Sequence, residues 1–483
     1  MVLAQLDDDQ RFLALKSRDA RFDGVFIVGV RTTGIYCRPS CPTPIQPLRK
    51  NVDFFLTAAA AQRSGLRACK RCRPDASPGS PEWDTRNDLV GRAMRLLNQG
   101  YLDNHSVNDL AGALHVTERH LRRIMIESVG APPVAIARAQ RAQTARTLIE
   151  TTGLKFSDIA FAAGFSSLRQ FNDTVRSVFD ATPTQLRKTR NHGLGESGLL
   201  SIRLPFRSPF PSDYFIQWSA ARTVHGVAEV KGATLRTALR LGRGQGRAEL
   251  QIEDSWVQCT LDLDHVSDLA LAVAQCRSLL DLDADPTHID EHLATIDSIA
   301  PLVRELPGLR SPGSADGFAT VVFAILGQQR SVAAARTLAS RIAERCSGPS
   351  DQLQPFPLPA QIAELDFDGI GLTGRGVETL RSVAALYEGR SDELARGADR
   401  EGIRNELLEV KGIGPWTANY VAMRVLGDPD IFLSGDLIAD RSAQALGLTP
   451  ELIEVARPWR SYLTHRLWAA SAASKNDTMN KDT

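Results

Sequence analysis

Four of the seven cysteines in this 483-residue chain form two close pairs, Cys37-x3-Cys41 and Cys69-x2-Cys72, with 27 residues between the pairs. Two cysteine pairs with this spacing are typical of a tetrahedral zinc site with four thiolate ligands. Such a site restricts the segment to folds that bring the two pairs together. One zinc ion per chain is therefore expected. A closed site that only holds a small domain together is the common explanation. Basic residues crowd these cysteines, however, and a zinc-bound thiolate beside a basic rim could act as a nucleophile toward a phosphate-bearing substrate.

Charged residues are divided unevenly along the chain, although its net charge is only +1. Residues 1–195 carry 28 Lys and Arg against 18 Asp and Glu, whereas residues 196–483 carry 29 against 38. The first part is therefore predicted to meet a polyanion, and any nucleic-acid contact in the second part must be local. The N-terminus shows no leader pattern, and no stretch approaches the roughly 18 apolar residues of a membrane span. A cytoplasmic protein with no membrane partner is expected, where clustered cysteines indicate metal or catalysis rather than disulfides.

The stretch around the cysteines, "VRTTGIYCRPSC…NVDFF…CKRC", carries the first resemblance. Over about residues 3–76 the chain resembles the N-terminal sensor domain of the bacterial adaptive-response protein, which takes a methyl group from a DNA methylphosphotriester. The resemblance implies that Cys37 is the methyl acceptor. It also implies a zinc ligand set of Cys37, Cys41, Cys69 and Cys72, and DNA contacts at Thr33 and Arg67. The segment "PTPIQP" after Cys41 departs from the arginine-bearing stretch of that family.

Between residues 87 and 188 apolar residues recur at helical spacing in two similar units. In each unit a short turn precedes a second helix, and these second helices carry Arg119, Arg122 and Arg169. A plain helical bundle with charged faces is the alternative. A joining helix over about 134–150 would span roughly 25 Å, so the second helices could reach successive major-groove faces. The stretch "IAFAAGFSSLRQFNDTVRSVFDATPTQLR" resembles the signature of the AraC-type DNA-binding domain, which implies operator binding and transcription activation, with RNA polymerase as the expected partner.

The sequence "LLEVKGIGPWTANYVAMRVLG" places Gly412-Ile413-Gly414 between two helical segments. This pattern is typical of a helix-hairpin-helix, in which glycines let backbone N–H groups approach a phosphate, although an ordinary interhelix turn is the commoner explanation of G-x-G. Asp436 follows about twenty residues later, with Asp430 and Asp440 nearby, and any of the three could be the chemically relevant carboxylate. The aromatic residues of this half either pack in a core or form a cage for a flipped base.

Residues 200–470 resemble 3-methyladenine DNA glycosylase II of the helix-hairpin-helix superfamily, through "FAILGQQRSVAAA", "GIGPWTANY" and "PWRSYLTHRLW". By this resemblance Asp436 is the catalytic carboxylate, which would stabilise a sugar cation or orient water as the N-glycosidic bond breaks. The resemblance also implies a base pocket of Trp416, Tyr420 and Trp468, and DNA contacts at Gln328, Gln329, Gly412 and Gly414. Gln329 stands where that family carries an apolar wedge residue. Trp416 stands where lyases of the superfamily carry a Schiff-base lysine, which favours hydrolysis without strand cleavage.

These motifs, with Pro-, Gly- and Ser-rich stretches between them, predict a multidomain α+β protein. The expected parts are a small zinc methyl-acceptor domain (1–78), an all-α double helix-turn-helix domain (84–190), a small α+β domain (197–310), an all-α helix-hairpin-helix glycosylase domain (311–470) and a disordered tail (471–483). The predicted function is a DNA-alkylation response protein that acts on double-stranded DNA as suicidal methyltransferase, transcription activator and monofunctional glycosylase. The alternative is a transcription regulator whose glycosylase-like half only binds DNA.

Overall fold

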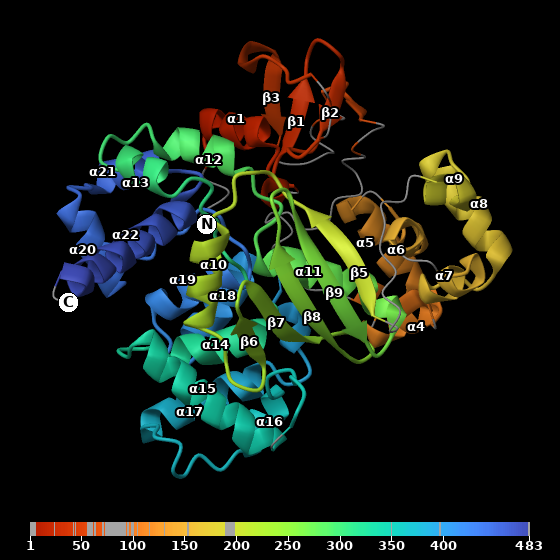
Figure 1. Ribbon diagram of the computed structural model, residues 1–483. Coiled ribbons are helices and arrows are strands. Elements are labelled where there is room, and N and C mark those ends of the chain that lie inside the picture. Colours follow the sequence, from red (N-terminus) through yellow and green to blue (C-terminus); the bar gives the residue numbers. More distant parts are fainter. Residues whose placement is uncertain are drawn as a thin grey trace.

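The computed structural model describes residues 6–23, 25–41, 43, 45–55, 61, 64–69, 72, 93, 96–97, 101–103, 105–114, 116–129, 131–151, 154–188, 199–348, 350–395 and 398–481. Along the chain these form a small sheet domain, a group of helices, a central antiparallel sheet and a larger helical region (Figure 1). This is the multidomain α+β architecture that the sequence predicted. Within the described residues, no helix combines the length and the apolar character needed to cross a lipid bilayer.

The N-terminal domain packs one helix against a four-stranded sheet of order β3-β1-β2-β4. Its helix α1 (Asp8–Ser17) begins after Asp7, whose carboxyl group accepts hydrogen bonds from the backbone of Asp9 and Gln10 in a capping box. The strands are β1 (Ile27–Val30), β2 (Ile35–Cys37), β3 (Val52–Phe55) and β4 (Arg67–Ala68). Strands β2 and β4 run parallel, while β1 pairs antiparallel with β2 and β3. Single 3-10 turns lie at Ala20–Phe22 and Arg49–Asn51.

The second domain consists of two helix-turn-helix units joined by one long helix. Its helices are α4 (Val107–Ala113), α5 (Glu118–Val129), α6 (Pro133–Thr151), α7 (Phe156–Ala162), α8 (Leu168–Phe179) and α9 (Pro183–Lys188), with a 3-10 turn at Tyr101–Asp103. Ser106 caps α4 and Ser167 caps α8 through their hydroxyl groups. The joining helix α6 agrees with the predicted 134–150 within one residue at each end. The second unit shares its apolar core with the neighbouring sheet, because Leu148, Ile149 and Phe171 belong to one cluster with Ile202 and Leu261.

The central sheet has five antiparallel strands in the order β5-β9-β8-β7-β6. Its strands are β5 (Leu200–Pro205), β6 (Ala228–Lys231), β7 (Thr234–Arg240), β8 (Gln245–Ile252) and β9 (Trp256–Leu263). Helix α10 (Ser212–Ala220) contacts β6 and β7, and α11 (Leu269–Leu279) contacts β8 and α6. A 3-10 turn at Val266–Asp268 precedes α11. Alternation of apolar and polar residues along β9 buries Val257, Cys259 and Leu261 on one face, which gives this sheet its core.

The remaining chain is helical. The helices are α12 (Pro286–Leu293), α13 (Ala300–Glu305), α14 (Gly317–Leu326), α15 (Val332–Ser347), α16 (Pro359–Glu364), α17 (Gly374–Leu386), α18 (Arg400–Glu409), α19 (Pro415–Arg424), α20 (Leu437–Ala445), α21 (Pro450–Val455) and α22 (Arg460–Lys481), with a 3-10 turn at Ser391–Glu393. They form two cores: one centres on α14 and α19, and the other joins α12 and α13 to α20 and α22.

Two details differ from the sequence-based expectations. Helices α12 and α13 fall within the predicted 197–310 domain, yet they share their core with helices that lie more than a hundred residues further along the chain. Helix α22 continues to Lys481, so residues 471–481 are helical where a disordered tail was expected. Polar composition alone does not stop a helix whose first turns are anchored in a core.

Candidate functional site

The four cysteines converge at one edge of the N-terminal sheet. Strands β2 and β4 run parallel, with Ile35 beside Arg67 and Tyr36 beside Ala68. Both strands therefore end at the same edge of the sheet, β2 at Cys37 and β4 just before Cys69. The amide of Cys69 donates to the carbonyl of Tyr36 at 2.9 Å. As a result, the sulfur atoms of Cys37, Cys41, Cys69 and Cys72 all lie within 4.8 Å of one another.

This cluster fits a single zinc ion. The Cys41 and Cys69 Sγ atoms are 3.9 Å apart, and sulfurs bound tetrahedrally at Zn–S distances near 2.3 Å stand roughly 3.8 Å apart. Hydrogen bonds from Cys41 and Cys72, followed by burial, raise the pKa of the Cys37 thiol far above its ordinary value. A zinc ion would offset the mutual repulsion of four thiolates packed this closely, so the cluster agrees with the predicted zinc ligand set.

The two predicted DNA contacts of this domain lie close to the cluster. Thr33 and Arg67 are exposed, and the amide of Arg67 donates to the carbonyl of Gly34, the residue after Thr33, at 2.8 Å. Both side chains thus lie at the start of the paired strands that end in the cysteines. Their contact with DNA stays a prediction.

The second helices of the two helix-turn-helix units present the predicted basic residues to solvent. Arg119 and Arg122 on α5 are exposed, as is Arg169 near the start of α8. The guanidinium of Arg169 lies 3.9 Å from Asp173, one turn along the same helix. An exposed ion pair of this kind is weak, so it leaves Arg169 available to a phosphate or a base.

Asp436 caps helix α20 and accepts four hydrogen bonds. Oδ1 accepts from the backbone N–H groups of Ile438 (3.1 Å) and Ala439 (2.9 Å) and from Trp468 Nε1 (2.9 Å). Oδ2 accepts from Trp416 Nε1 at 3.2 Å. The carboxyl group is half-buried and held between two indole rings and the start of a helix, so its orientation is fixed.

The three predicted pocket aromatics form one group around this carboxyl group. Trp416 and Tyr420 lie one turn apart on α19, with ring centroids 5.4 Å apart and planes inclined by 21°. Tyr420 and Trp468 are 6.4 Å apart at 45°. Tyr420 is buried and both tryptophans are half-buried, so the three rings form one aromatic cluster beside Asp436.

Sequence reasoning missed a second wall, which comes from the α+β domain. Trp218 lies on α10 and Arg222 follows the end of that helix, with its guanidinium 4.3 Å from the Trp218 ring centroid. Burial lowers the pKa of Arg222, and its contacts with Tyr420 and the Asp436 carboxylate oppose this shift. No local motif marks α10, which lies about 200 residues before the hairpin, so only the packing of the two domains reveals this contribution.

A buried histidine lies behind the pocket. The ring of His465 meets Trp468 edge-on at 4.9 Å and lies 6.2 Å from Trp218. Its side chain has no exposed surface, and neither ring nitrogen has a hydrogen-bond partner among the described residues. Burial, with smaller effects from Arg424 and Arg222, holds the pKa of His465 well below its usual value. The imidazole is therefore neutral at pH 7.

The glycine turn joins α18 to α19 as a helix-hairpin-helix. Gly412 has φ +98°, and a Cβ at this position would lie 2.1 Å from Thr379 Oγ1. Gly414 directly precedes α19 and leaves its first amides open. Gln328 uses its amide nitrogen to brace the hairpin, donating to the Gly412 carbonyl (2.9 Å) and Thr417 Oγ1 (3.0 Å), and its predicted contact with DNA stays a prediction. Gln329 is exposed in the turn after α14, with φ +56°.

The two neighbouring aspartates have different surroundings from Asp436. Asp430 is fully buried and paired with Arg457 (2.9 Å) and Arg460 (2.8 Å), which makes it part of the fold. Asp440 is exposed and accepts a hydrogen bond from the Gly435 amide at 3.0 Å. Of the three carboxylates, Asp436 alone contacts the pocket aromatics among the described residues.

Comparisons with known proteins agree with this division of the chain. The family models that match are the metal binding domain of Ada over residues 10–75, a helix-turn-helix domain over 110–189 and the AlkA N-terminal domain over 201–316. Over 478 residues, covering 96% of both chains, the protein is 46% identical to the probable bifunctional transcriptional activator/DNA repair enzyme AlkA of Mycobacterium tuberculosis. The chain belongs to this AlkA family.

Two further proteins are similar to only part of this chain. Regulatory protein ada of Salmonella typhimurium is 36% identical over 188 residues, covering 39% of this chain and 51% of its own length. DNA-3-methyladenine glycosylase 2 of Escherichia coli is 31% identical over 280 residues, covering 55% of this chain and 95% of its own. The resemblances identified in the sequence are thereby confirmed.

Proposed function

We propose that this chain is a bifunctional DNA-alkylation response protein. Its N-terminal domain takes a methyl group from a DNA methylphosphotriester onto Cys37 and thereby activates transcription of repair genes through its helix-turn-helix units and RNA polymerase. Its C-terminal half excises alkylated purines of the 3-methyladenine type. The observation that carries the excision proposal is the carboxyl group of Asp436, held by two indole N–H groups within a cluster of aromatic rings.

For base excision, Asp436 acts where positive charge develops. As the bond between C1′ and the purine nitrogen breaks, its electron pair leaves with the base and the sugar becomes cationic. A fixed carboxylate stabilises this cation without reorganising. Water then adds to C1′ and loses a proton, which leaves an intact abasic site. Tryptophan stands at position 416, so no amine is present there for lyase chemistry.

The aromatic pocket favours the proposed substrate. Trp416, Tyr420 and Trp468 offer ring faces that attract a positively charged, electron-poor purine more strongly than a neutral one. His465, behind Trp468, is neutral, so the preference for a cationic base rests on the ring faces and the Asp436 carboxylate, which must outweigh the positive charge of Arg222.

For methyl transfer, zinc would keep the clustered sulfurs as thiolates at neutral pH. The Cys37 sulfur attacks the methyl carbon of the triester, so that an S–C bond forms while the C–O bond breaks and the DNA phosphate leaves as a diester anion. Methylation removes one unit of negative charge from the cluster beside a basic edge. Repulsion from the DNA backbone falls accordingly, which supports activation by tighter operator binding.

Substitution of the carboxylate tests the excision proposal. Asp436→Asn should lower release of 3-methyladenine by two to three orders of magnitude, since one such electrostatic contact contributes about 3–4 kcal/mol. Asp440→Asn is the matched control and should keep nearly full activity, because Asp440 only accepts a bond from a loop amide. Release of free base is measured by chromatography under single-turnover conditions. Wild-type release at the uncatalysed rate would favour the alternative, a regulator whose glycosylase-like half only binds DNA.

A further inference from the structure

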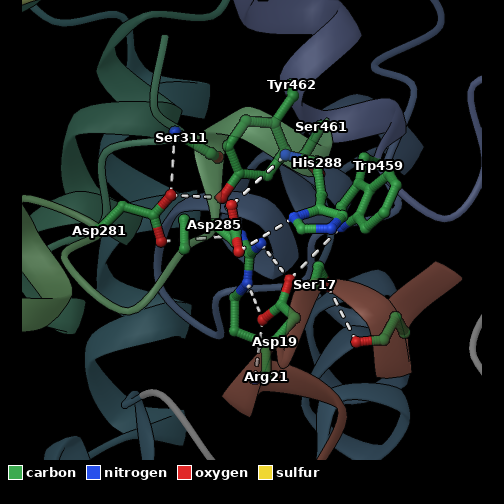
Figure 2. A network of polar contacts seen from close by, with 12 residues as sticks. Ser17, Asp19, Arg21, Asp281, Asp285, His288, Ser311, Trp459, Ser461 and Tyr462 are labelled. Carbon is green, nitrogen blue, oxygen red and sulfur yellow. Dashed lines mark hydrogen bonds and ion pairs between the residues drawn. The ribbon is translucent and has the colours of Figure 1, made fainter. Parts of the chain in front are cut away.

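A buried charged network joins the N-terminal domain to helix α22 (Figure 2). Arg21 donates to both carboxyl oxygens of Asp19 and to the hydroxyl of Tyr462, and its NH1 atom lies 3.6 Å from Asp281 Oδ1. The Tyr462 hydroxyl donates to Asp281, and Trp459 Nε1 donates to Asp19 at 3.4 Å. Arg21 is 7% exposed and the other four residues are fully buried.

Such a network fixes the two domains against each other. A buried charge that loses its partner is strongly destabilising, so separation of the domains would have to hydrate Asp19, Arg21 and Asp281 together. Asp281 also has φ +52°, a left-handed conformation that a non-glycine residue keeps only when its surroundings hold it. Apolar packing accompanies the charges, because Leu13 of α1 contacts the core shared by α12 and α22.

On the N-terminal side, the network lies next to the cysteine cluster. Asp23, two residues after Arg21, accepts hydrogen bonds from the backbone amide (2.9 Å) and the hydroxyl of Ser40. Its carboxyl group also lies 3.4 Å from Arg38 Nε. Ser40 and Arg38 occupy the short loop between Cys37 and Cys41, so the segment 19–23 contacts the cysteine loop at one end and α22 at the other.

On the C-terminal side, α22 holds the segment that leads into Asp436. Ser461 accepts from the Ile431 amide at 3.0 Å, and Thr464 accepts from the Leu433 amide at 3.2 Å. Further along the same helix, Trp468 donates directly to Asp436. The position of α22 therefore sets both the approach of the chain to Asp436 and one of the bonds that orient its carboxyl group.

We propose that zinc loading of the N-terminal domain is linked to base excision through Arg21, which acts as a positioning residue for α22 and Asp436. This inference rests on the proposed glycosylase function. The N-terminal domain is then the intramolecular partner that braces the excision site, and loss of its metal, which unfolds small zinc domains, releases that brace.

The test compares zinc-loaded and chelator-treated full-length protein as wild type, as Arg21→Met and as Arg31→Met. Arg31 is the matched control, because its side chain is 58% exposed and pairs with Asp53 within the N-terminal sheet. Hydrogen exchange of the amides at 460–468, single-turnover base release and the affinity for abasic duplex DNA are measured. The temperature is one at which every variant is folded.

In wild type and Arg31→Met, removal of zinc should accelerate exchange in 460–468 by at least about tenfold, as for a helix that loses a buried contact. Base release should slow by roughly tenfold, because small displacements of a catalytic group are costly, while affinity for abasic DNA stays within about twofold. Arg21→Met should show these changes with zinc present, and removal of zinc should add nothing further.

Unchanged exchange in the zinc-free wild type would overturn the linkage, as would an Arg21→Met protein that still responds to zinc. If Arg21→Met does not fold, Tyr462→Phe serves instead, since it keeps the ring and removes only the hydroxyl that joins Arg21 to Asp281. Failure of the proposed function is a separate outcome, in which zinc-loaded wild type releases no base. In that case hydrogen exchange in 460–468 still tests whether zinc loading affects α22.

Discussion

Asp436 combines two roles that are usually filled by different residues. As the cap of α20 it satisfies two backbone amides, and between Trp416 and Trp468 it meets two indole N–H groups. The N-terminal end of a helix also favours negative charge. These contacts hold the carboxylate in one orientation before substrate arrives, which is the condition under which a charged group lowers a barrier most effectively.

Asp430 illustrates why sequence proximity to a catalytic residue is a poor guide. Its side chain is fully buried, and Arg457 and Arg460 approach it from the loop before α22 and the start of that helix. Asp430→Asn would remove a buried charge that pairs with two half-buried guanidinium groups, and although both also pair with Glu454, we expect the variant to be less stable. A loss of activity in this variant would therefore report on folding and not on chemistry.

His465 makes a prediction about pH. Its pKa is held well below the ordinary value in the folded state, whereas an unfolded histidine titrates near pH 6.5. Below about pH 6.5 the unfolded chain gains a proton that the folded chain does not, so stability falls as pH is lowered, by up to about 1.4 kcal/mol per pH unit for this group. At pH 7 and above the contribution is absent.

Comparison with His465→Leu isolates this effect. As pH is lowered from 7 to 5.5, the free energy of unfolding should fall less steeply in the variant. The difference in slope should be up to about 1.4 kcal/mol per pH unit, which corresponds to one proton. Stability at pH 7.5 should not decrease, because leucine removes two ring nitrogens that have no partner among the described residues. Denaturant unfolding at several pH values measures both. Identical slopes for the two proteins would show that His465 is not buried as a neutral ring.

At the scale of elements, the hairpin between α18 and α19 depends on a glycine at position 412. Its φ is +98°, and a Cβ added there would lie only 2.1 Å from Thr379 Oγ1, which leaves no room for a side chain. Thr379 cannot move easily, because it is buried and its hydroxyl donates to the Arg375 and Lys411 carbonyls. The turn must therefore shift if any other residue is placed there.

We predict that Gly412→Ala weakens binding to abasic duplex DNA by at least tenfold, since one lost charge-assisted hydrogen bond contributes about 1.5–3 kcal/mol. Gly389→Ala is the control, because Gly389 also has positive φ (+67°) but a Cβ there meets nothing within 4 Å. Gly389→Ala introduces the same kind of backbone strain but no steric clash with a neighbouring side chain. The DNA affinity of this variant should stay unchanged. Fluorescence anisotropy measures both affinities. Equal binding by the two variants would show that the hairpin does not contribute to phosphate recognition.

Elements that follow from nearby residues were predictable, and those that depend on distant packing were not. The cysteine pairs, the two helix-turn-helix units and the Gly412–Gly414 turn each carry their information within about thirty residues. The pocket wall at Trp218 and Arg222 and the bracing role of Gln328 arise from contacts across 84 or more positions, for which no local pattern exists. Helix α22 extends past the predicted end for the same reason, because its anchor lies in a tertiary core.

At the scale of the whole molecule, the parts are joined more closely than linkers alone would allow. The second helix-turn-helix unit shares a core with the central sheet, and the N-terminal domain contacts α22 through Arg21. The described parts of these three regions lie around the central sheet (Figure 1). We therefore expect a change at the cysteine cluster to reach the excision half by contact, and to reach DNA bound by the helix-turn-helix units by charge.

The charge mechanism predicts a salt-dependent switch. Protein methylated on Cys37 should bind its operator more tightly than unmodified protein, by about 1 kcal/mol for one unit charge near 4 Å in water, or roughly fivefold. The gain should shrink as salt rises from 0.05 to about 0.5 M, because screening weakens the repulsion that methylation relieves. Equal affinities at the lowest salt would leave only a conformational explanation for activation.

The most direct measurement is a single incubation of zinc-loaded protein with methylated duplex DNA, followed by analysis of both products. Wild type should yield free 3-methyladenine and one methyl group on the peptide that contains Cys37. Asp436→Asn should yield the same methylated peptide with almost no free base, because the two chemistries use different residues of one chain. Methyl groups on another cysteine, or full base release by Asp436→Asn, would contradict the account.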